Sequence, residues 1–551
     1  MPRISLPDQL ATHEVLNQPP PLVDFNAFEL DVPLQSALER NGAAAHRDQL
    51  AVFGKRVGSF EALEWGRLAN ENPPKLKTFD RFGHRIDEVE FHPAYHQLMR
   101  LGLESGVSGA AWTAEQAGHT LHASLLYLMT QADAGTACPM SMTYAVVPAL
   151  RAEPAVAAEW EPRVTSGRYD PRFIPAAEKT GATMGMAMTE KQGGSDVRAN
   201  TTRAHALGTG EYELIGHKWF CSAPMSDAFL TLAYAEGGLT CFLVPRWRPD
   251  GTRNAIHIMR LKDKLGDRSN ASSEIEYHGA WAQRVGEEGR GIRTIIDMVQ
   301  GTRLDCIAGS AAGMRAALTQ AAWHTRHRTA FQRQLADQPA MRGVLADLAL
   351  EVEAATALMI RIASAFDAAQ ASDEREAAFA RLATPIAKYW VCKRQPGFVY
   401  EALECLGGAG FVEEGPMPRL FRQSPLNAIW EGSGNVIALD ALRALTREPQ
   451  AWEALRAELG LAQGAHPLLD AAIDRIDGIR VNGVPAESEA RAFVETVALA
   501  LEAACLRDAP SAVLAGFCAT RLDPDNRAFL HGAASASLDT DRLLARALPS
   551  E

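Results

Sequence analysis

Hydrophobic side chains recur at helical spacing in two long parts of the chain. In the first part, about residues 41–180, stretches such as 92–104 and 120–134 carry apolar residues three or four positions apart. In the second part, about residues 290–446, a repeated spacing of three and four predicts a long helix packed in a bundle. The seam of this helix consists of Leu345, Leu348, Val352, Ala355, Met359, Ile362 and Phe366. We therefore expect two helical domains, over 41–180 and 290–446.

The pattern changes to short runs between these two helical parts. Residues 213–222, 227–235, 239–247 and 255–261 are apolar or alternate between apolar and polar, and Gly, Pro, Asn and Asp separate them. Short alternating runs bounded by such residues are typical of strands. We expect a β domain over 181–289.

The two ends of the chain differ from each other. Residues 1–40 are proline-rich around NQPPPLVDF, which predicts an extended arm laid on the surface or on a neighbouring subunit; the alternative is a disordered tail. Residues 447–551 again have helical spacing, which predicts an extra C-terminal helical domain. Its apolar face consists of Phe493, Val494, Val497, Ala498, Leu501, Ala504 and Cys505.

Composition narrows the classes of partner. The chain has 551 residues, 47% of them hydrophobic, and Lys and Arg total 55 against 67 Asp and Glu, a net charge of −12. This balance does not suggest nucleic acid or an anionic membrane as a partner. Residues 447–551 carry ten arginines and no lysine against sixteen acidic residues, a net charge of −6. Such a charge is the opposite of a phosphate-binding surface.

Several common sites and signals are missing from the sequence. The eight cysteines form no CxxC pair, and their sparse use fits a reducing cytosol. The first residues lack the apolar core of a signal peptide, and no uncharged apolar run reaches the ~18 residues of a membrane helix. We expect a cytoplasmic protein with no membrane contact. His92 and His96, and His119 and His122, have helical spacing but no obvious carboxylate to complete a metal site, so we expect no metal.

Motifs for phosphate loops, dinucleotide folds and nucleophile elbows are absent, but glycine-rich segments with polar neighbours remain. In MAMTEKQGGSDV, 186–197, Gly193 and Gly194 allow a tight turn beside the hydroxyls of Thr189 and Ser195. Such a turn binds a phosphate or a planar heterocycle, although composition alone favours a plain surface turn. In HKWFCS, 217–222, strand alternation places Phe220 and Ser222 on one face, which suits stacking on a flat cofactor; the alternative is a core aromatic.

Two further segments follow in the bundle region. In HTRHRTAFQRQ, 324–334, Arg328 and Phe331 are three apart at a helix end, hence on one face, and could hold a pyrophosphate and an adenine. The alternative is a solvated charged face. In ECLGGAGF, 404–411, Gly407 and Gly408 end a helix, and the alternative to a binding role is a helix cap.

The last segment, IWEGSGNVIALDALR at 429–443, places one acid, Glu431, between a tryptophan and a Gly-Ser-Gly step. A carboxylate in a dry cleft can serve as a general base, because burial raises its pKa toward working pH. The alternative is an acidic N-cap of the apolar helix that follows.

The order of these segments carries a resemblance. TEKQGGSDV, then KWFCS, RTAF, LGGAGF and WEGSGN resemble the acyl-CoA dehydrogenase superfamily over roughly residues 41–446. NQPPPL, GRLANENPP, EVEFHPAYH, MTEKQGGSDV, GTRLDCIAG and IWEGSGN, with the domain after 447, are similar to its AidB-type branch, linked to the adaptive response to alkylation. The resemblance implies an N-terminal helical domain, a β-barrel-like middle domain and a C-terminal four-helix bundle. The whole would be mostly α with a central β domain.

The resemblance also implies a reaction. Glu431 would remove the α-proton of an acyl-CoA thioester while a β-hydride leaves for flavin N5 of FAD, and an electron-transfer acceptor would reoxidise the flavin. FAD shared between subunits implies a homotetramer. The residues that match the family's cofactor contacts are Met188, Thr189, Gly194, Ser195, Phe220, Ser222, Arg328, Phe331, Gly407, Gly408, Trp430, Gly432, Ser433 and Asn435. Of these, Arg328 and Phe331 would reach the FAD of a neighbouring subunit, and Gly407 and Gly408 its adenine end.

Departures from the family pattern modify these expectations. Trp430 replaces the usual tyrosine before the base and narrows the acyl cleft, which favours short or branched acyl-CoA. Glu404 replaces a glutamine, and Gln423 and Ser424 follow Arg422 where Asp-Ala is usual, so we expect weak turnover. A flavoprotein that binds double-stranded DNA and protects it from alkylation is the alternative. A nitroalkane-oxidase-like enzyme would have Asp as its base, so Glu431 counts against it.

Overall fold

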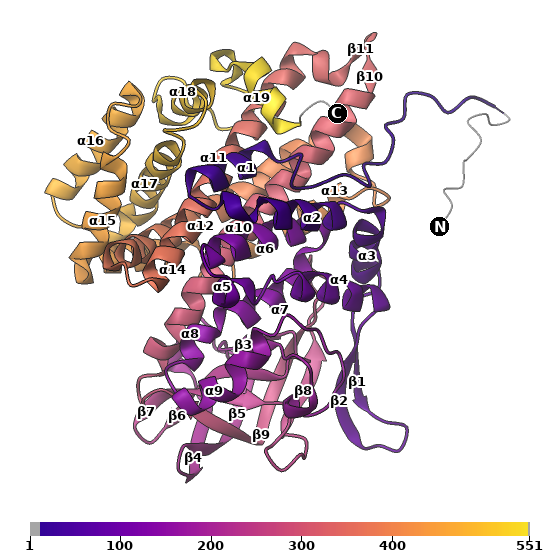
Figure 1. Ribbon diagram of the computed structural model, residues 1–551, viewed down its shortest axis with the longest axis vertical. Coiled ribbons are helices and arrows are strands. Elements are labelled where there is room, and N and C mark those ends of the chain that lie inside the picture. The colour runs from indigo at the N-terminus through magenta and orange to yellow at the C-terminus, as the bar shows by residue number, and fades with distance from the viewer. Residues whose placement is uncertain (1–11, 549–551) are drawn as a thin grey trace.

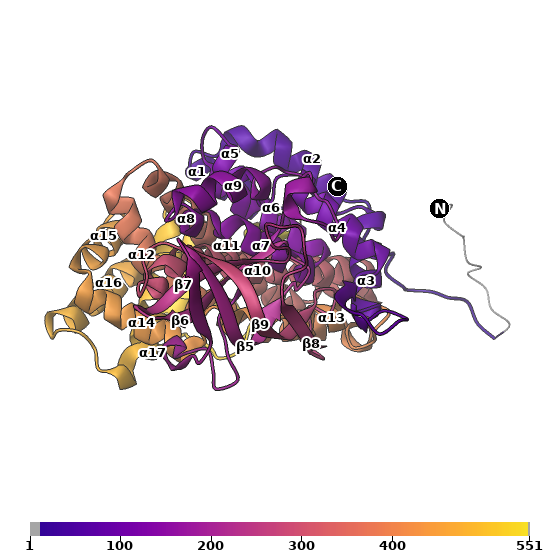
Figure 2. The same ribbon diagram turned by 90° about the horizontal axis from the view of Figure 1, so that it is seen from below.

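A computed structural model of the chain describes residues 12–548 (Figure 1). The β domain lies at one end of the molecule, long helices run away from it, and the last helices pack against one side of these long helices. Seen from the β end, the strands lie in front of the bundle (Figure 2). The predicted fold class, mostly α with a central β domain, is confirmed.

The N-terminal helical part surrounds one helix that is buried on all sides. This helix, α6 (Gly118–Ala132), is buried along nearly its whole length and packs against the long helices of the bundle. Its buried polar side chains, such as His122, Ser124 and Thr130, are hydrogen-bonded, as burial of polar groups requires. The other helices of this part are α1 (Val32–Arg40), α2 (Arg47–Val57), α3 (Phe60–Glu71), α4 (Pro93–Glu104), α5 (Ala110–Thr113), α7 (Ala134–Ala145), α8 (Val147–Leu150) and α9 (Pro154–Val164).

Two features of this part differ from the sequence-based expectation. The expected extended arm, residues 1–40, contains helix α1, whose Leu34 and Ala37 are buried in the core, so the prediction is wrong for residues 32–40. The hairpin β1 (Lys75–Phe79) and β2 (Arg85–Glu90) lies inside the predicted helical domain. Its Asp87 accepts a hydrogen bond from the Ile258 N–H, so the hairpin is fastened to the β domain.

The β domain closes on itself. Strand β6 pairs with β7, β7 with β9, β9 with β5, β5 with β4, and β4 returns to β6 through the single pair Arg203–Tyr234. This ring confirms the barrel-like architecture and leaves β3 and β8 as outer strands. The bounds are β3 (Met184–Ala187), β4 (Arg203–Gly208), β5 (Glu211–Ser222), β6 (Ala228–Ala235), β7 (Gly238–Pro245), β8 (Ile256–Leu261) and β9 (Ser272–Val285).

The four-helix bundle consists of α10 (Gly291–His327), α11 (Pro339–Gln370), α12 (Glu374–Glu404) and α14 (Gly434–Arg447). Six of the seven seam positions predicted on α11 are buried, and Phe366 packs against the same core. The short helix α13 (Met417–Gln423) and a two-stranded hairpin, β10 (Thr329–Ala330) and β11 (Arg333–Gln334), complete this part.

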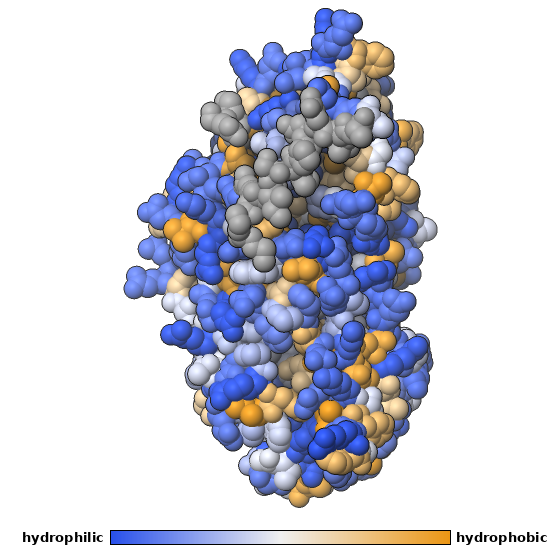
Figure 3. All heavy atoms as spheres, turned by 90° about the vertical axis from the view of Figure 1, so that its right-hand side faces the viewer, coloured by the Kyte–Doolittle hydropathy of each residue, from blue (hydrophilic) through white to orange (hydrophobic). Residues whose placement is uncertain are grey.

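The C-terminal helices are α15 (Pro449–Gly460), α16 (Pro467–Val481), α17 (Ala490–Cys505), α18 (Ser511–Phe517) and α19 (Thr540–Ala547). The predicted apolar face of α17 packs on α11 and α12, so this region shares one core with the bundle. The face of the molecule on the right-hand side of Figure 1 is mostly hydrophilic, with scattered apolar side chains (Figure 3). Within residues 12–548, every helix is too short or too polar to cross a membrane.

Candidate active site

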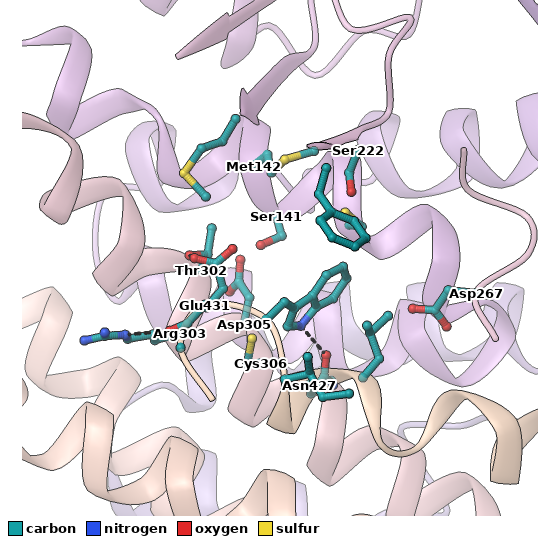
Figure 4. A pocket seen from close by; sticks show the side chains of 18 of the residues that line it. Ser141, Met142, Ser222, Asp267, Thr302, Arg303, Asp305, Cys306, Asn427 and Glu431 are labelled. Atoms are coloured by element: carbon teal, nitrogen blue, oxygen red, sulfur yellow. Dashed lines mark hydrogen bonds between the residues drawn. The ribbon is translucent and has the colours of Figure 1, made fainter. Parts of the chain in front are cut away.

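A cavity of about 770 Å³ lies where the β domain, helices α6 and α7, helix α10 and the segment before α14 meet. The β domain contributes Phe220 and Ser222, and the bundle contributes Thr302 and Asp305 on α10. Figure 4 shows side chains from these elements pointing toward one another across it. The cavity therefore collects residues that are far apart in the sequence.

Glu431 occupies a strained turn at the edge of this cavity. Its φ is +57°, and Gly432 follows with a φ of +106°. A left-handed backbone is unfavourable for a non-glycine residue and occurs often at functional sites. The next helix, α14, begins only at Gly434, with Ser433 at the N-cap position. Glu431 is therefore not the cap of that helix, which excludes the alternative raised from the sequence.

Hydrogen bonds from two cationic side chains hold the turn. Lys388, on α12 and almost fully buried, donates to the carbonyl oxygens of Trp430 at 2.8 Å and of Gly432. Arg303 donates through Nε to the Glu431 carbonyl at 3.2 Å and pairs with Asp440 at 2.8 Å. These contacts satisfy the carbonyl groups of the turn and hold its backbone.

The Glu431 carboxylate has little compensation for its burial. Burial raises its pKa above the usual range, and nearby Asp305 adds to the rise. The Thr302 hydroxyl, which donates to Glu431 Oε2 at 2.8 Å, acts in the opposite direction, as do Lys388 and Arg303. A carboxylate with a raised pKa is suited to accept a proton from a weakly acidic substrate.

Most of the predicted cofactor residues line the cavity. Those that do, besides Glu431, are Met188, Thr189, Gly194, Ser195, Phe220, Ser222, Trp430, Gly432 and Ser433. Phe220 and Ser222 face the cavity together, as strand alternation predicts. The Trp430 indole donates to Asn427 Oδ1 at 2.9 Å, the dashed bond in Figure 4.

A buried ion pair that we did not predict shapes the loop 188–195. Glu190 accepts hydrogen bonds from Lys218 Nζ at 2.9 Å and from the backbone and hydroxyl groups of Thr201 and Thr202. Both members of the pair are fully buried. Inside the loop, a Cβ on Gly194 would lie 2.3 Å from the Thr189 hydroxyl, so only glycine fits there. The ion pair and this close contact define the shape of the loop.

The cavity wall has unfilled hydrogen-bonding capacity. Among buried side-chain atoms without a partner are Asp267 Oδ1, Asn270 Oδ1, Asp305 Oδ2, Gln395 Oε1 and Gln423 Nε2, and all five residues line the cavity. Buried polar groups normally find partners. With the aromatic and hydroxyl groups of Phe220 and Ser222, this wall fits a large ligand with both flat apolar and polar parts, as FAD is.

The remaining predicted cofactor residues lie elsewhere. Gly407, Gly408 and Asn435 do not line the cavity. Arg328 and Phe331 do not share a helix face, contrary to our expectation, because α10 ends at His327. Phe331 instead occupies the turn between β10 and β11 with a φ of +52° and is 94% exposed. The sequence spacing suits a helix, but the helix ends at His327, before either residue.

Four site residues escaped the sequence analysis as functional positions: Thr302, Arg303, Asp305 and Lys388. The first three stand in GTRLDC, a phrase that we used only for the resemblance, whereas nothing near Lys388 marks it. The histidine pairs contact other groups: His119 hydrogen-bonds Tyr144, and His122 contacts Asp305 at 2.8 Å. Across residues 12–548, His, Cys, Asp and Glu do not gather into a group of three that could hold a metal ion.

Three family models match the chain. The adaptive response protein AidB N-terminal domain matches residues 17–171, the acyl-CoA dehydrogenase middle domain 185–280, and the acyl-CoA dehydrogenase C-terminal domain 289–446. Together they cover the helical, β and bundle parts that surround the cavity.

Similar proteins point the same way. The putative acyl-CoA dehydrogenase AidB of Escherichia coli is 47% identical over 84% of this chain and 86% of its own length. Acyl-CoA dehydrogenase family member 11 of Caenorhabditis elegans is 31% identical over 76% of this chain and 69% of its own. The crystal structure of C. elegans ACDH-11 in complex with C11-CoA superposes with a TM-score of 0.81 at 25% identity, covering 97% of this chain and 92% of that one. The chain belongs to the acyl-CoA dehydrogenase family and to its AidB type.

Proposed function

We propose that this protein is an FAD-dependent acyl-CoA dehydrogenase in which Glu431 takes the α-proton of an acyl-CoA thioester. The observation that carries the proposal is the Glu431 carboxylate itself. It projects from a strained turn held by Lys388 and Arg303, it lies on a cavity wall, and burial raises its pKa. The family is FAD-dependent, and relatives at high identity are acyl-CoA dehydrogenases by name.

Different residues of the chain would bind the cofactor and accept the proton. Thr189, Ser195 and Ser222 would hold the cofactor through their hydroxyl groups, and Phe220 would pack against its flat part. When bound, FAD supplies the acceptor for the β-hydride. Glu431 accepts the α-proton on its carboxylate. The Thr302 hydroxyl, which donates to Oε2 at 2.8 Å, orients that carboxylate and leaves Oε1 available for the proton.

The acyl-CoA substrate is also part of the proposal. ACDH-11, which shares the fold over nearly the whole chain, is in complex with C11-CoA. Trp430 lines the cavity immediately before the base, and its indole is fixed by Asn427. A fixed bulky wall disfavours long straight chains, so we propose a preference for short or branched acyl groups.

Replacing Glu431 by glutamine tests the base. The amide is nearly isosteric but cannot accept a proton, so anaerobic flavin reduction by an acyl-CoA panel should fall by roughly 10²–10⁴-fold. FAD content should stay unchanged, and the free energy of unfolding should not fall, since a buried uncompensated carboxylate is removed. Thr302→Val, which leaves the base in place, is the matched control and should lose less.

Two outcomes contradict the proposal in different ways. Retained reduction in Glu431→Gln would show that another group is the base. Absence of reduction in the wild-type protein with every thioester would remove the dehydrogenase function itself.

We also propose that the protein is a homotetramer. Arg328 and Phe331 lie at the far end of α10, outside the cavity of their own chain, and Phe331 is exposed. Their position suits contact with the cofactor of a neighbouring subunit. Arg328→Ala should lower FAD retention during gel filtration by roughly tenfold, because a charge-assisted phosphate contact is lost. Arg333→Ala in the same hairpin is the control; equal retention in both would remove Arg328 from the site.

Double-stranded DNA binding by the C-terminal domain gains no support from the structure. Six of the ten arginines after residue 446 pair with acidic side chains. They are Arg456, Arg507, Arg521, Arg527, Arg542 and Arg546. Arginines that are neutralised within the fold add little to a phosphate-binding surface.

A further inference from the structure

Asp305 lies beside Glu431 on the cavity wall, and the reaction described above does not use it. It stands on α10, one turn after Thr302, and is 6% exposed. Figure 4 shows its side chain next to those of Glu431 and Thr302. The site therefore holds a second buried carboxyl group close to the base. Burying such a group is unfavourable unless it is paired or hydrogen-bonded.

A histidine, His122, shares a proton with this carboxyl group. His122 Nδ1 hydrogen-bonds the carbonyl oxygen of Val107, which can only accept, so Nδ1 carries a proton. His122 Nε2 lies 2.8 Å from Asp305 Oδ1. A hydrogen bond there needs a further proton, because a bare imidazole nitrogen and a carboxylate oxygen are both acceptors. The pair thus shares one proton more than a neutral imidazole and a free carboxylate.

The pair opens only toward the cavity. His122 and Val107 are fully buried, and the imidazole ring stacks on Tyr144 with centroids 3.5 Å apart. Oδ1 of Asp305 is engaged by His122, whereas Oδ2 has no hydrogen-bonding partner within residues 12–548. Oδ2 is therefore a buried acceptor that can take a hydrogen bond from a donor group of a ligand.

A second orphaned group stands on the next helix. Gln395, on α12, also lines the cavity, is 5% exposed and leaves Oε1 without a partner. Gly309 and Gly313 line the same part of α10, and a Cβ on Gly313 would lie 2.1 Å from Gln395 Nε2. Gln395 therefore fills the space beside Gly313, and its Oε1 is a second buried acceptor on the cavity wall.

We propose that Asp305 accepts a hydrogen bond from a hydroxyl or amino group carried on the acyl chain. The substrates of this site are then acyl thioesters with a donor beyond the reacting α and β carbons, in preference to plain alkyl thioesters. The inference rests on the proposed function, since it names the substrate class of the same cavity. Asp305 is a specificity-determining residue here, and His122 is its positioning residue.

A plain alkyl chain would bind in this cavity with a less favourable free energy. It would displace water from Oδ2 and offer nothing in return, which leaves a buried acceptor unpaired. Sites built to bond a substrate hydroxyl reject the analogue that lacks it. We expect a preference of roughly tenfold or more in dissociation constant.

The test compares two ligands of equal size. The probes are 5-hydroxyvaleryl-CoA and hexanoyl-CoA, whose acyl groups have the same number of non-hydrogen atoms. Their dissociation constants are measured by calorimetry on FAD-loaded Glu431→Gln protein, so that turnover does not interfere. The hydroxy ester should bind roughly tenfold more tightly.

Two substitutions at Asp305 separate the acceptor from the shared proton. Asp305→Asn can donate to His122 Nε2 and keep an oxygen toward the cavity, so most of the preference should remain. Asp305→Leu removes the acceptor, so the preference should vanish. Cys306→Ala, a neighbouring cavity residue, is the control and should keep the preference.

The outcomes distinguish this inference from the proposed function. Equal binding of both esters overturns the inference, while reduction of the wild-type flavin by the alkyl ester leaves the dehydrogenase function intact. If Asp305→Leu still binds the hydroxy ester more tightly, the hydroxyl group bonds to another residue. That result overturns the role of Asp305. If neither ester binds, both proposals fall. If Asp305→Leu does not fold, Asp305→Ala, which also lacks the acceptor, takes its place.

Discussion

Two regions of this protein bury acidic side chains but pair them in opposite ways. At the junction of α11, α12 and the C-terminal segment, Glu351 receives Arg394 and Arg521, both at 2.8 Å. Asp347 in the same region pairs with Arg521 at 2.7 Å and accepts the Gly532 N–H. In the cavity, Glu431 accepts one side-chain hydrogen bond, from Thr302.

The pKa values follow this difference. Burial alone would raise the pKa of Asp347, but Arg521 and His531 outweigh it and lower the pKa to about 2. The arginines likewise hold the pKa of Glu351 below its usual range. In the cavity, burial prevails: it raises the pKa of Glu431 and brings that of Asp267 to about 7.

Glu502, also at the junction, shows that the pKa of a buried acid depends on its partner and not on the region in which it lies. Glu502 accepts the indole N–H of Trp390 at 2.9 Å but has no arginine in hydrogen-bonding contact, and burial raises its pKa well above the usual range. The comparison teaches that arginine pairing converts a buried acid into a structural element. An acid left without such a partner remains able to exchange a proton, which is what a general base requires.

The largest expected effect comes from breaking the junction. Arg521→Met leaves Glu351 and Asp347 without one of their main partners, and removing one member of a buried ion pair costs about 3–5 kcal/mol of the free energy of unfolding. Urea denaturation measures this. Arg527→Met, at the more exposed pair with Glu495, should cost about 1 kcal/mol or less. Equal losses in the two variants would show that burial of the pair is irrelevant.

The second prediction concerns the cavity and compares how the free energy of unfolding varies with pH in the wild type and in Asp267→Asn. Because burial raises the pKa of Asp267 to about 7, the folded state binds its proton more tightly than the unfolded chain does. The wild type should therefore lose stability as pH rises from about 4 through 7, by about 4 kcal/mol. The asparagine variant should lack this loss and be more stable at pH 8. Asp474→Asn, exposed on α16, serves as control; identical pH curves for all three proteins contradict the assignment.

The smallest effect concerns the cavity wall. Trp430→Tyr removes the bond to Asn427 but no charge, so the free energy of unfolding should change by only about 1 kcal/mol. The smaller ring should let longer acyl groups reduce the flavin, by roughly tenfold relative to short ones. Stopped-flow reduction with a short, a branched and a long acyl-CoA checks this. An unchanged chain-length profile would mean that Trp430 does not border the acyl group.

Much of the architecture could be read from the sequence. The seam of α11 and the apolar face of α17 have a period near 3.6 residues, and the short runs after residue 181 have the punctuation of strands. Phe220 and Ser222 fall on one strand face because the strand period is two. These features depend on neighbours in the chain, so local periodicity determines them.

Local errors had local causes. The end of α10 at His327 decides that Arg328 and Phe331 do not share a helix face, and element ends are what periodicity fixes least well. The hairpin β1–β2 is short and partly exposed, so its hydrophobic pattern is weak. Helix α1 stands where prolines suggested an extended arm, although a proline is tolerated in the first turn of a helix.

The sequence by itself determined the order of helical and β parts, and it named the candidate base and nine other predicted residues that line the cavity. Only the tertiary structure decided what surrounds the base. Lys388 reaches the turn at Glu431 from 43 positions away, and His122 meets Asp305 across 183 positions. Such contacts are set by how helices pack, because the free energy of a buried charge depends on whichever groups the fold brings within a few ångströms of it. No period along the chain encodes that distance.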